Sequence, residues 1–376
     1  MLIRQRCCEN ADSQLIDRSM RIRYSLIAAF VLCLSAIEAD NAFGDEVAAS
    51  QQQTQHENQQ QTVEPIVVGG IAFSFSNLDQ ARELLAAQDE FVRRMSPFDR
   101  KFRMQSTTDP GLDAFLEFAA GEALQWNDDL QAKVISALDE LRQPLGGYSF
   151  KNLRQINLIF TSGLEEAGSA YTRGNSIVFQ KSVSNEITAA LVAHELFHVV
   201  SRHDPILRDK LYRIIGFQPA GVDIRLPADL TDLRMTNPDA PLSQHVMKVE
   251  TAENEEAWVA PVLFAKQPFD PESGFSFFDY LDFQLMEVAP LVGKNGKRWA
   301  AVSKDGKTVM HPPAIPSFHR QIGSNTGYIL HPEEILADNF ALLLTNGAIR
   351  DSWVINQIRQ TIQSNHNLKA NLDEQQ

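Results

Sequence analysis

The chain has 376 residues, enough for one large domain or two small ones and for a sizeable hydrophobic core. Its formal net charge of −14 excludes the extended basic surface with which proteins bind nucleic acids. The three cysteines (Cys7, Cys8 and Cys33) lie near the N-terminus without a metal-binding spacing, so any metal site must use histidines and carboxylates.

Residues 1–44 have the features of a secretory signal peptide. A basic start precedes a short apolar run, Ser25–Ile37, and the small residues Ala42 and Gly44 suit cleavage after Gly44. Met20, at the head of the basic start, is an alternative first residue. The apolar run is too short for a permanent membrane span, although an uncleaved anchor is the rival interpretation. The sequence therefore predicts a secreted or periplasmic protein with no permanent span after cleavage.

A glutamine-rich segment without periodicity, residues 45–64, is expected to be a disordered linker. Residues 65–150 then form a mainly helical region that contains no recognisable chemistry. The patterns predict one strand followed by three helices: Ile66–Phe75, Leu78–Met95, Asp113–Trp126 and Leu130–Leu141.

Residues 151–376 are expected to form the second region of the globular part, and two short strands lie at its start. The apolar runs Asn157–Phe160 and Ser176–Gln180 predict these strands, with Tyr171–Asn175 as a turn or loop between them. A strand directly before the next helix is either an exposed edge that binds an extended peptide or an ordinary packed strand.

The helix Asn185–Asp204 carries the strongest signal in the chain. His194 and His198 are one turn apart on one face, and Glu195 lies about 100° further round the same turn. This HExxH spacing lets two imidazoles bind Zn²⁺ while the carboxylate reaches a water on the metal. The alternative is an amphipathic core helix with ordinary histidines. His203 follows at the wrong spacing for a third histidine ligand and is expected to be a helix-end residue.

Residues 206–320 are expected to be a mixed, strand-rich insertion. His245–Val249 and Ala257–Ala265 predict a hairpin, and further strands are expected at Tyr280–Val288, Arg298–Val302 and Thr308–Met310. The aromatic residues at 275, 277, 278 and 280 are assigned to the core in preference to a substrate pocket.

A second helix, beginning at Pro332, offers the third metal ligand. Glu334 and Asp338 are four residues apart and share a face. Glu333 is the alternative register for the ligand. Acids of the insertion are further alternatives, and they are Glu255, Glu256, Asp279 and Asp282.

The two motifs together resemble the gluzincin (thermolysin-type) zinc metallopeptidases, which combine HExxH with ExxxD on a second helix. The resemblance covers only these two helices, and the separation between them is long for that family. It implies an α+β, zincin-like fold, with His194, His198 and Glu334 as zinc ligands. It also implies that Asp338 accepts a hydrogen bond from His194 and orients it.

The function expected from these residues is hydrolysis of a peptide or protein substrate by a zinc-activated water, with Glu195 as general base. Tyr328, His331 and His319 are weak candidates for the donor to the oxyanion. Two other functions stay open: a catalytically silent, zinc-containing envelope binding protein, and a zinc hydrolase that acts on substrates other than peptides.

Overall fold

The computed structural model describes residues 64–150, 153–166, 168–251, 253, 255–293 and 296–373. The predicted signal peptide and the predicted linker up to residue 63 lie outside the described residues. Within the described ranges, no helix combines the length and the hydropathy that crossing a bilayer requires.

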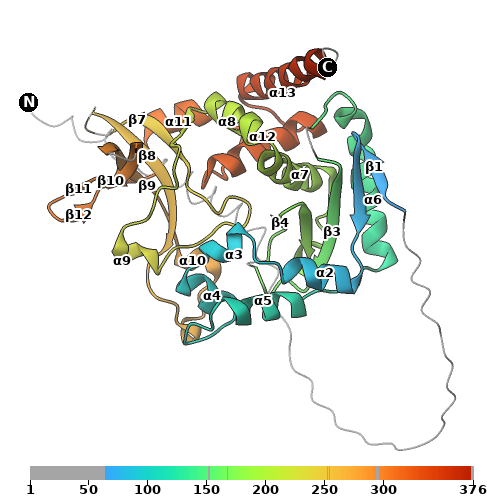
Figure 1. Ribbon diagram of the computed structural model, residues 1–376, viewed down its shortest axis with the longest axis horizontal. Helices are drawn as coiled ribbons and strands as arrows, with labels where there is room; N and C mark the ends of the chain where they lie inside the picture. The colour runs from blue at the N-terminus through green and yellow to red at the C-terminus, as the bar shows by residue number, and fades with distance from the viewer. Residues whose placement is uncertain are drawn as a thin grey trace, which may run out of the picture. The chain divides into compact units, whose positions relative to one another are not determined.

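A five-stranded mixed sheet forms one layer of the fold (Figure 1). Its strands, in the spatial order β1-β2-β3-β5-β4, are β1 (Ile66–Val68), β2 (Ile71–Phe75), β3 (Gln155–Thr161), β5 (Ser176–Gln180) and β4 (Tyr171–Arg173). The expected single strand at residues 66–75 is a hairpin. Its turn residues Gly69 and Gly70 have φ of 58° and 78°, which glycine adopts without steric cost.

Alternation along the central strands explains how this sheet separates two cores. Ile156, Leu158 and Phe160 of β3 face the main core, while Ile159 faces a smaller core beneath the N-terminal helices. Because successive side chains of a strand point to opposite faces, both faces of β3 are covered.

The loop expected at Tyr171–Asn175 is wrong in its first half, because Tyr171–Arg173 is strand β4, paired antiparallel with β5. Only Gly174 and Asn175 form the turn of this hairpin. The strand Ser176–Gln180 is consequently not an edge. It lies between β3 and β4 with all five residues buried, and the edge belongs to β4.

The N-terminal helices differ in length from the predicted ones, since the first is divided in two, the second is shorter and the third is longer. They are α2 (Leu78–Leu85), α3 (Glu90–Arg94), α4 (Pro97–Arg103), α5 (Leu112–Gly121) and α6 (Asp128–Leu145). The helix expected at residues 78–95 breaks in two because Asp89 caps a new helix by accepting a hydrogen bond from the Val92 amide. Strand β2 pairs with β3, so the regions before and after residue 150 share one sheet.

The strand-rich segment follows the motif helix, as expected. Helix α8 (Pro205–Ile214) leads into a six-stranded antiparallel sheet of order β10-β9-β8-β7-β6, with β13 on β9. Its strands are β6 (Phe217–Pro219), β7 (His245–Glu250), β8 (Glu256–Ala265), β9 (Leu281–Gly293), β10 (Gly296–Ala301) and β13 (Met310–His311). The predicted hairpin is confirmed as β7 and β8.

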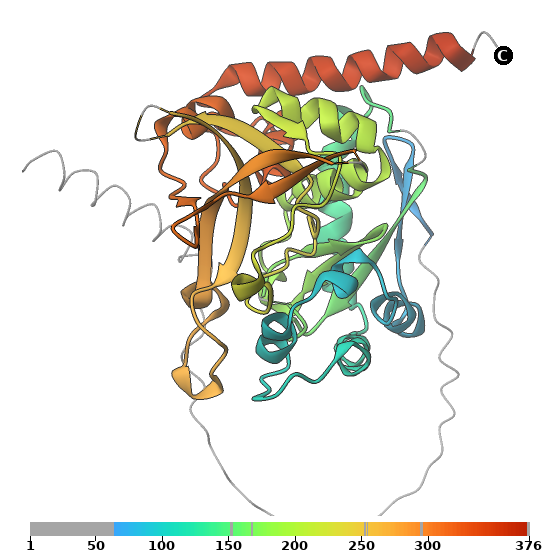
Figure 2. The same cartoon turned by 60° about the vertical axis from the view of Figure 1, so that its left-hand side comes forward.

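Short elements complete this segment and the C-terminal part. They are η1 (Lys181–Val183), α9 (Ala228–Thr231), η2 (Pro271–Ser273), α10 (Phe277–Tyr280), β11 (Ser303–Lys304), β12 (Lys307–Thr308) and α11 (Pro316–Ile322). The long helix α13 (Ser352–Asp373) packs on α8 and α12 (Figure 2). The mixture of helices and two sheets confirms the α+β class.

The two motif helices, α7 (Ala189–His203) and α12 (Pro332–Thr345), pack against each other in the main core. The rings of Phe197 and Phe340 lie 5.6 Å apart at this contact. Each is almost completely buried, which stabilises the pair by about 1.5–3 kcal/mol per side chain. This contact fixes the distance between the residues of the two motifs.

Candidate metal centre

Helix α7 positions the first three site residues. The Thr188 hydroxyl caps its N-terminus by accepting from the Leu191 amide, and the helix ends before Pro205 as expected. His194 and His198 project from one face with their ring centroids 4.8 Å apart. Both histidines therefore face the same neighbour, which is helix α12.

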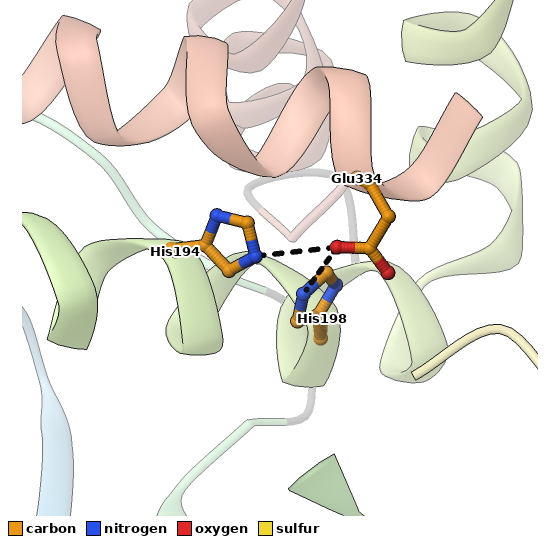
Figure 3. Close-up of side chains that lie close together, drawn as sticks. All are labelled: His194, His198 and Glu334. Atoms are coloured by element: carbon orange, nitrogen blue, oxygen red, sulfur yellow. Dashed lines mark ion pairs between the residues drawn. The ribbon is translucent and has the colours of Figure 1, made fainter. Parts of the chain in front are cut away.

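The third predicted residue, Glu334, lies opposite both imidazoles (Figure 3). Its Oε2 is 3.3 Å from His194 Nε2 and 3.6 Å from His198 Nε2. Ligand atoms that are tetrahedrally arranged about zinc at the usual bond lengths lie about 3.3 Å from one another. The three side chains thus have the spacing of a zinc-binding His₂Glu set.

The outward-facing nitrogens are also bound. His194 Nδ1 lies 2.9 Å from Asp338 Oδ1, and His198 Nδ1 lies 3.1 Å from Glu333 Oε1. A carboxylate can only accept, so each Nδ1 carries the proton, and the Nε2 lone pair of the neutral ring remains for a metal. Asp338 thus lies beside His194, as the resemblance implied. Glu333, the alternative third ligand, contacts the outer nitrogen of His198 and not the nitrogen that faces Glu334.

Glu333 lies in a buried polar cage that the sequence did not reveal. Besides His198, the hydroxyls of Ser201 and Tyr212 donate to its carboxylate. Burial raises the pKa of Glu333, but the hydrogen bonds and the charge of His198 outweigh it and hold the pKa below its usual value. The Glu333 carboxylate therefore orients the second histidine.

A loop of the strand-rich segment adds two further residues that sequence reasoning missed. The Asn237 amide donates to Glu334 Oε1 at 2.5 Å. Asp239 lies with its carboxylate within 4.8 Å of the nearest polar side-chain atoms of Glu195 and His198. No local sequence pattern predicts either residue, because both reach the site through tertiary contacts.

Glu195 is buried beside these residues, with 2% of its surface exposed, and its Oε2 has no hydrogen-bond partner. Burial raises the pKa of Glu195, and the neighbouring negative charge of Asp239 adds to the rise. An unpartnered carboxylate oxygen in the interior is costly, so its presence at this place calls for a ligand or a bound water.

The neighbouring carboxylates raise the pKa values of both imidazoles. Burial lowers the pKa of His198, but Asp239, Glu334 and Glu333 outweigh it and raise the pKa to about 9. For His194, the hydrogen bonds to Asp338 and Glu334 likewise outweigh burial and raise the pKa well above its ordinary value. A divalent cation would replace these protons, so the donor set and its spacing fit a metal ion.

Of the remaining candidates, Tyr328 lies beside the site, and the three histidines have other positions. Tyr328 stacks 6.5 Å from the His194 ring and is 36% exposed. His331 is the N-cap of α12, where its Nδ1 accepts from the Glu333 amide. Burial lowers the pKa of His331 to about 4, so its ring is neutral. His319 is exposed on α11, which packs on β7, and His203 is the exposed last residue of α7.

The acids proposed from the insertion do not join the histidines. Among the described residues, the metal-binding groups that include a histidine of α7 use only Glu195, Asp239 and Glu334 as carboxylates. Glu256 pairs instead with Lys248, and Asp279 caps α10. Of the predicted third-ligand candidates, Glu334 is therefore the one whose carboxylate lies beside both imidazoles.

A family model described as the eCIS core domain matches residues 165–206. The matched segment contains β4, β5 and α7, and hence His194, Glu195 and His198, but not Glu334. No curated protein and no solved structure gives a significant match to the chain. The likeness to this family thus covers His194, Glu195 and His198 and ends before Glu334.

Proposed function

We propose that this chain is a secreted or periplasmic zinc metallopeptidase of the gluzincin type. The observation that carries the proposal is the convergence of His194 Nε2, His198 Nε2 and Glu334 Oε2 beside a buried carboxylate, Glu195, that keeps a free oxygen. The extracytoplasmic location rests on the signal-peptide features of residues 1–44.

The proposed chemistry is hydrolysis of a peptide bond. When bound, zinc supplies Lewis-acid activation of water and of the scissile carbonyl. Glu195 accepts a proton from the attacking water as the carbon–oxygen bond forms, and it delivers that proton to the leaving amine when the carbon–nitrogen bond then breaks. Asp338 and Glu333 hold the two imidazoles in the tautomer that faces the metal.

Tyr328 is the donor that we assign to the carbonyl oxygen in the proposed reaction. Its ring lies against His194 and remains partly exposed, whereas His331 is committed to capping α12 and His319 lies on α11. A Tyr328→Phe variant is expected to lower kcat with little change in zinc content.

The proposal is tested with the purified chain lacking residues 1–44, analysed for metal content and for hydrolysis of fluorescein-labelled casein. The parent should carry about one zinc per chain. Glu195→Gln should keep that zinc and lose hydrolysis, because the carboxylate is not itself a ligand.

Three outcomes decide the matter. Unchanged hydrolysis in Glu195→Gln would refute the mechanism. Zinc at full occupancy without hydrolysis in the parent would favour the silent binding protein or a hydrolase for other substrates. A folded parent that takes up no added zinc would exclude the metal centre.

A further inference from the structure

A pocket that opens to solvent lies beside the candidate metal centre, and its volume is about 570 Å³ when the open solvent within it is included. Its walls are largely aromatic and apolar, and they come from β4, from the loop after α9, from α10 and from the segment before α12. Representative lining residues are Tyr171, Asp239, Phe277, Phe278, Tyr328 and Leu330. The pocket therefore reaches the metal site through Asp239 and Tyr328.

Two acidic side chains line this pocket, and they differ in their partners. Glu166 forms a 2.7 Å ion pair with the guanidinium of Arg103. Asp239 Oδ1 accepts from the amide and the hydroxyl of Thr172, at 2.7 and 2.6 Å, and both donors are neutral. Arg202 contacts the main-chain carbonyl of Asp239, and within the described part of the chain no lysine or arginine forms an ion pair with its carboxylate.

A second observation at the same place concerns a buried polar atom that lacks a partner. The Glu195 Oε2 atom is unpartnered in a side chain that is 98% buried, and it belongs to the cluster that also holds Asp239. Buried carboxylates in folded proteins are paired with cations or metals, since an isolated one is costly.

One zinc ion does not balance the negative charges of the carboxylates that surround the site. A zinc ion contributes two positive charges, whereas Glu334 binds it directly and Glu333 and Asp338 hold its histidine ligands. These three carboxylates already exceed the charge of the ion. Glu195 and Asp239 are further carboxylates beside the ion, and of these two Asp239 lines the pocket, where Arg202 contacts its main-chain carbonyl and forms no direct ion pair with its carboxylate.

We propose that Asp239 binds a positively charged group of the substrate, an ammonium or guanidinium, in the aromatic pocket next to the metal. This inference rests on the proposed peptidase function, because it assumes a peptide in the pocket. The half-open rings of Phe278 and Tyr328, each 36% exposed, suit such a group, since aromatic faces attract cations and cover aliphatic stems. A lysine or arginine side chain and a free N-terminus share this chemistry.

Binding of uncleaved probe peptides tests the inference. Calorimetry is performed on the Glu195→Gln protein with equimolar zinc. The first probe pair is an end-blocked alanine pentapeptide with a central lysine and its norleucine counterpart. The second pair is an alanine pentapeptide with a free and with an acetylated N-terminus, which separates the two sources of the charge.

The charged member of at least one pair should bind at least about tenfold more tightly than its neutral counterpart, with a preference that weakens as salt rises. Asp239→Asn in the same background should remove the preference and keep the binding of the neutral peptide. Asp282→Asn is the matched control, because Asp282 lies on β9 with its carboxylate bonded to Gln284.

Equal binding of charged and neutral peptides by the parent, or a preference that survives Asp239→Asn, would overturn the inference. Should that variant fail to fold, the preference of the parent and its salt dependence decide. Zinc content is measured on the same samples. If the parent protein binds no zinc but still prefers the charged peptide, the peptidase proposal alone is refuted. If the parent binds zinc but shows no preference for the charged peptide, the cation site alone is refuted.

Discussion

The neighbouring carboxylates Glu333 and Glu334 lie on opposite sides of the imidazoles, so replacing each by alanine should produce a different defect. Glu333→Ala removes the acceptor of three buried donors: His198 Nδ1, the Ser201 hydroxyl and the Tyr212 hydroxyl. A buried donor without a partner costs about 1–3 kcal/mol. The metal-free protein should therefore lose at least about 3 kcal/mol of unfolding free energy.

The effects on zinc should differ more strongly. Loss of an outer partner of a histidine ligand weakens zinc affinity by about 10–100-fold, which is the expectation for Glu333→Ala. Glu334→Ala leaves only two protein ligands, and the loss should be well beyond that range.

Urea unfolding of the chelated proteins and zinc competition with a chromophoric chelator measure the two quantities. Glu333→Gln, which keeps an acceptor oxygen, is the control for the hydrogen bonds. A zinc affinity that falls further in Glu333→Ala than in Glu334→Ala would refute the assignment of the ligand.

Three more predictions follow from contacts at and around the site. Asp338→Ala should weaken zinc binding by about 10–100-fold in chelator competition and leave a folded protein; unchanged affinity would contradict its role. Arg103→Met should lower the unfolding free energy by about 3–5 kcal/mol, because it leaves two buried carboxylates unpaired, whereas Lys248→Met at an exposed pair should cost less than about 1 kcal/mol. For pH, the folded-state pKa of His198 is raised from 6.5 to about 9, so its contribution is present below pH 6.5 and lost as pH rises through 9. The metal-free protein should lose up to about 3 kcal/mol over this window in urea unfolding, and a flat profile would count against the proton assignment.

The sequence was sufficient to predict the two helices that contain the candidate site residues. The apolar spacing around His194 and His198 and the Pro332 start of the second helix are local signals. The second helix begins at Pro332 as predicted, whereas the first begins at Ala189, four residues after the predicted start. The choice of Glu334 over Glu333 rested on the resemblance, with Asp338 four residues further on, and the structure brings Glu334 to the histidines.

Other parts depend on contacts that no local pattern reports. Asn237 reaches Glu334 from a position 97 residues earlier, and Tyr212 reaches Glu333 across 121 residues. Strand β4 was missed because its three residues gain strand geometry only by pairing with β5. Helices α8 and α13 were not predicted, although Asp204 and Pro205 are a recognisable start for the first of them.

The guanidinium of Arg103, 1% exposed, binds Asp99 of its own helix, Glu166 after β3 and the carbonyl of Thr236 just before the Asn237 loop. One cation thus fastens the N-terminal helices to the segment that completes the pocket. Excising residues 64–150 as a propeptide would leave Glu166 as an uncompensated buried acid and would free the loop that carries Asp239. Proteolysis that preserves the pocket must therefore leave the helix that carries Asp99 and Arg103 attached to the rest of the chain.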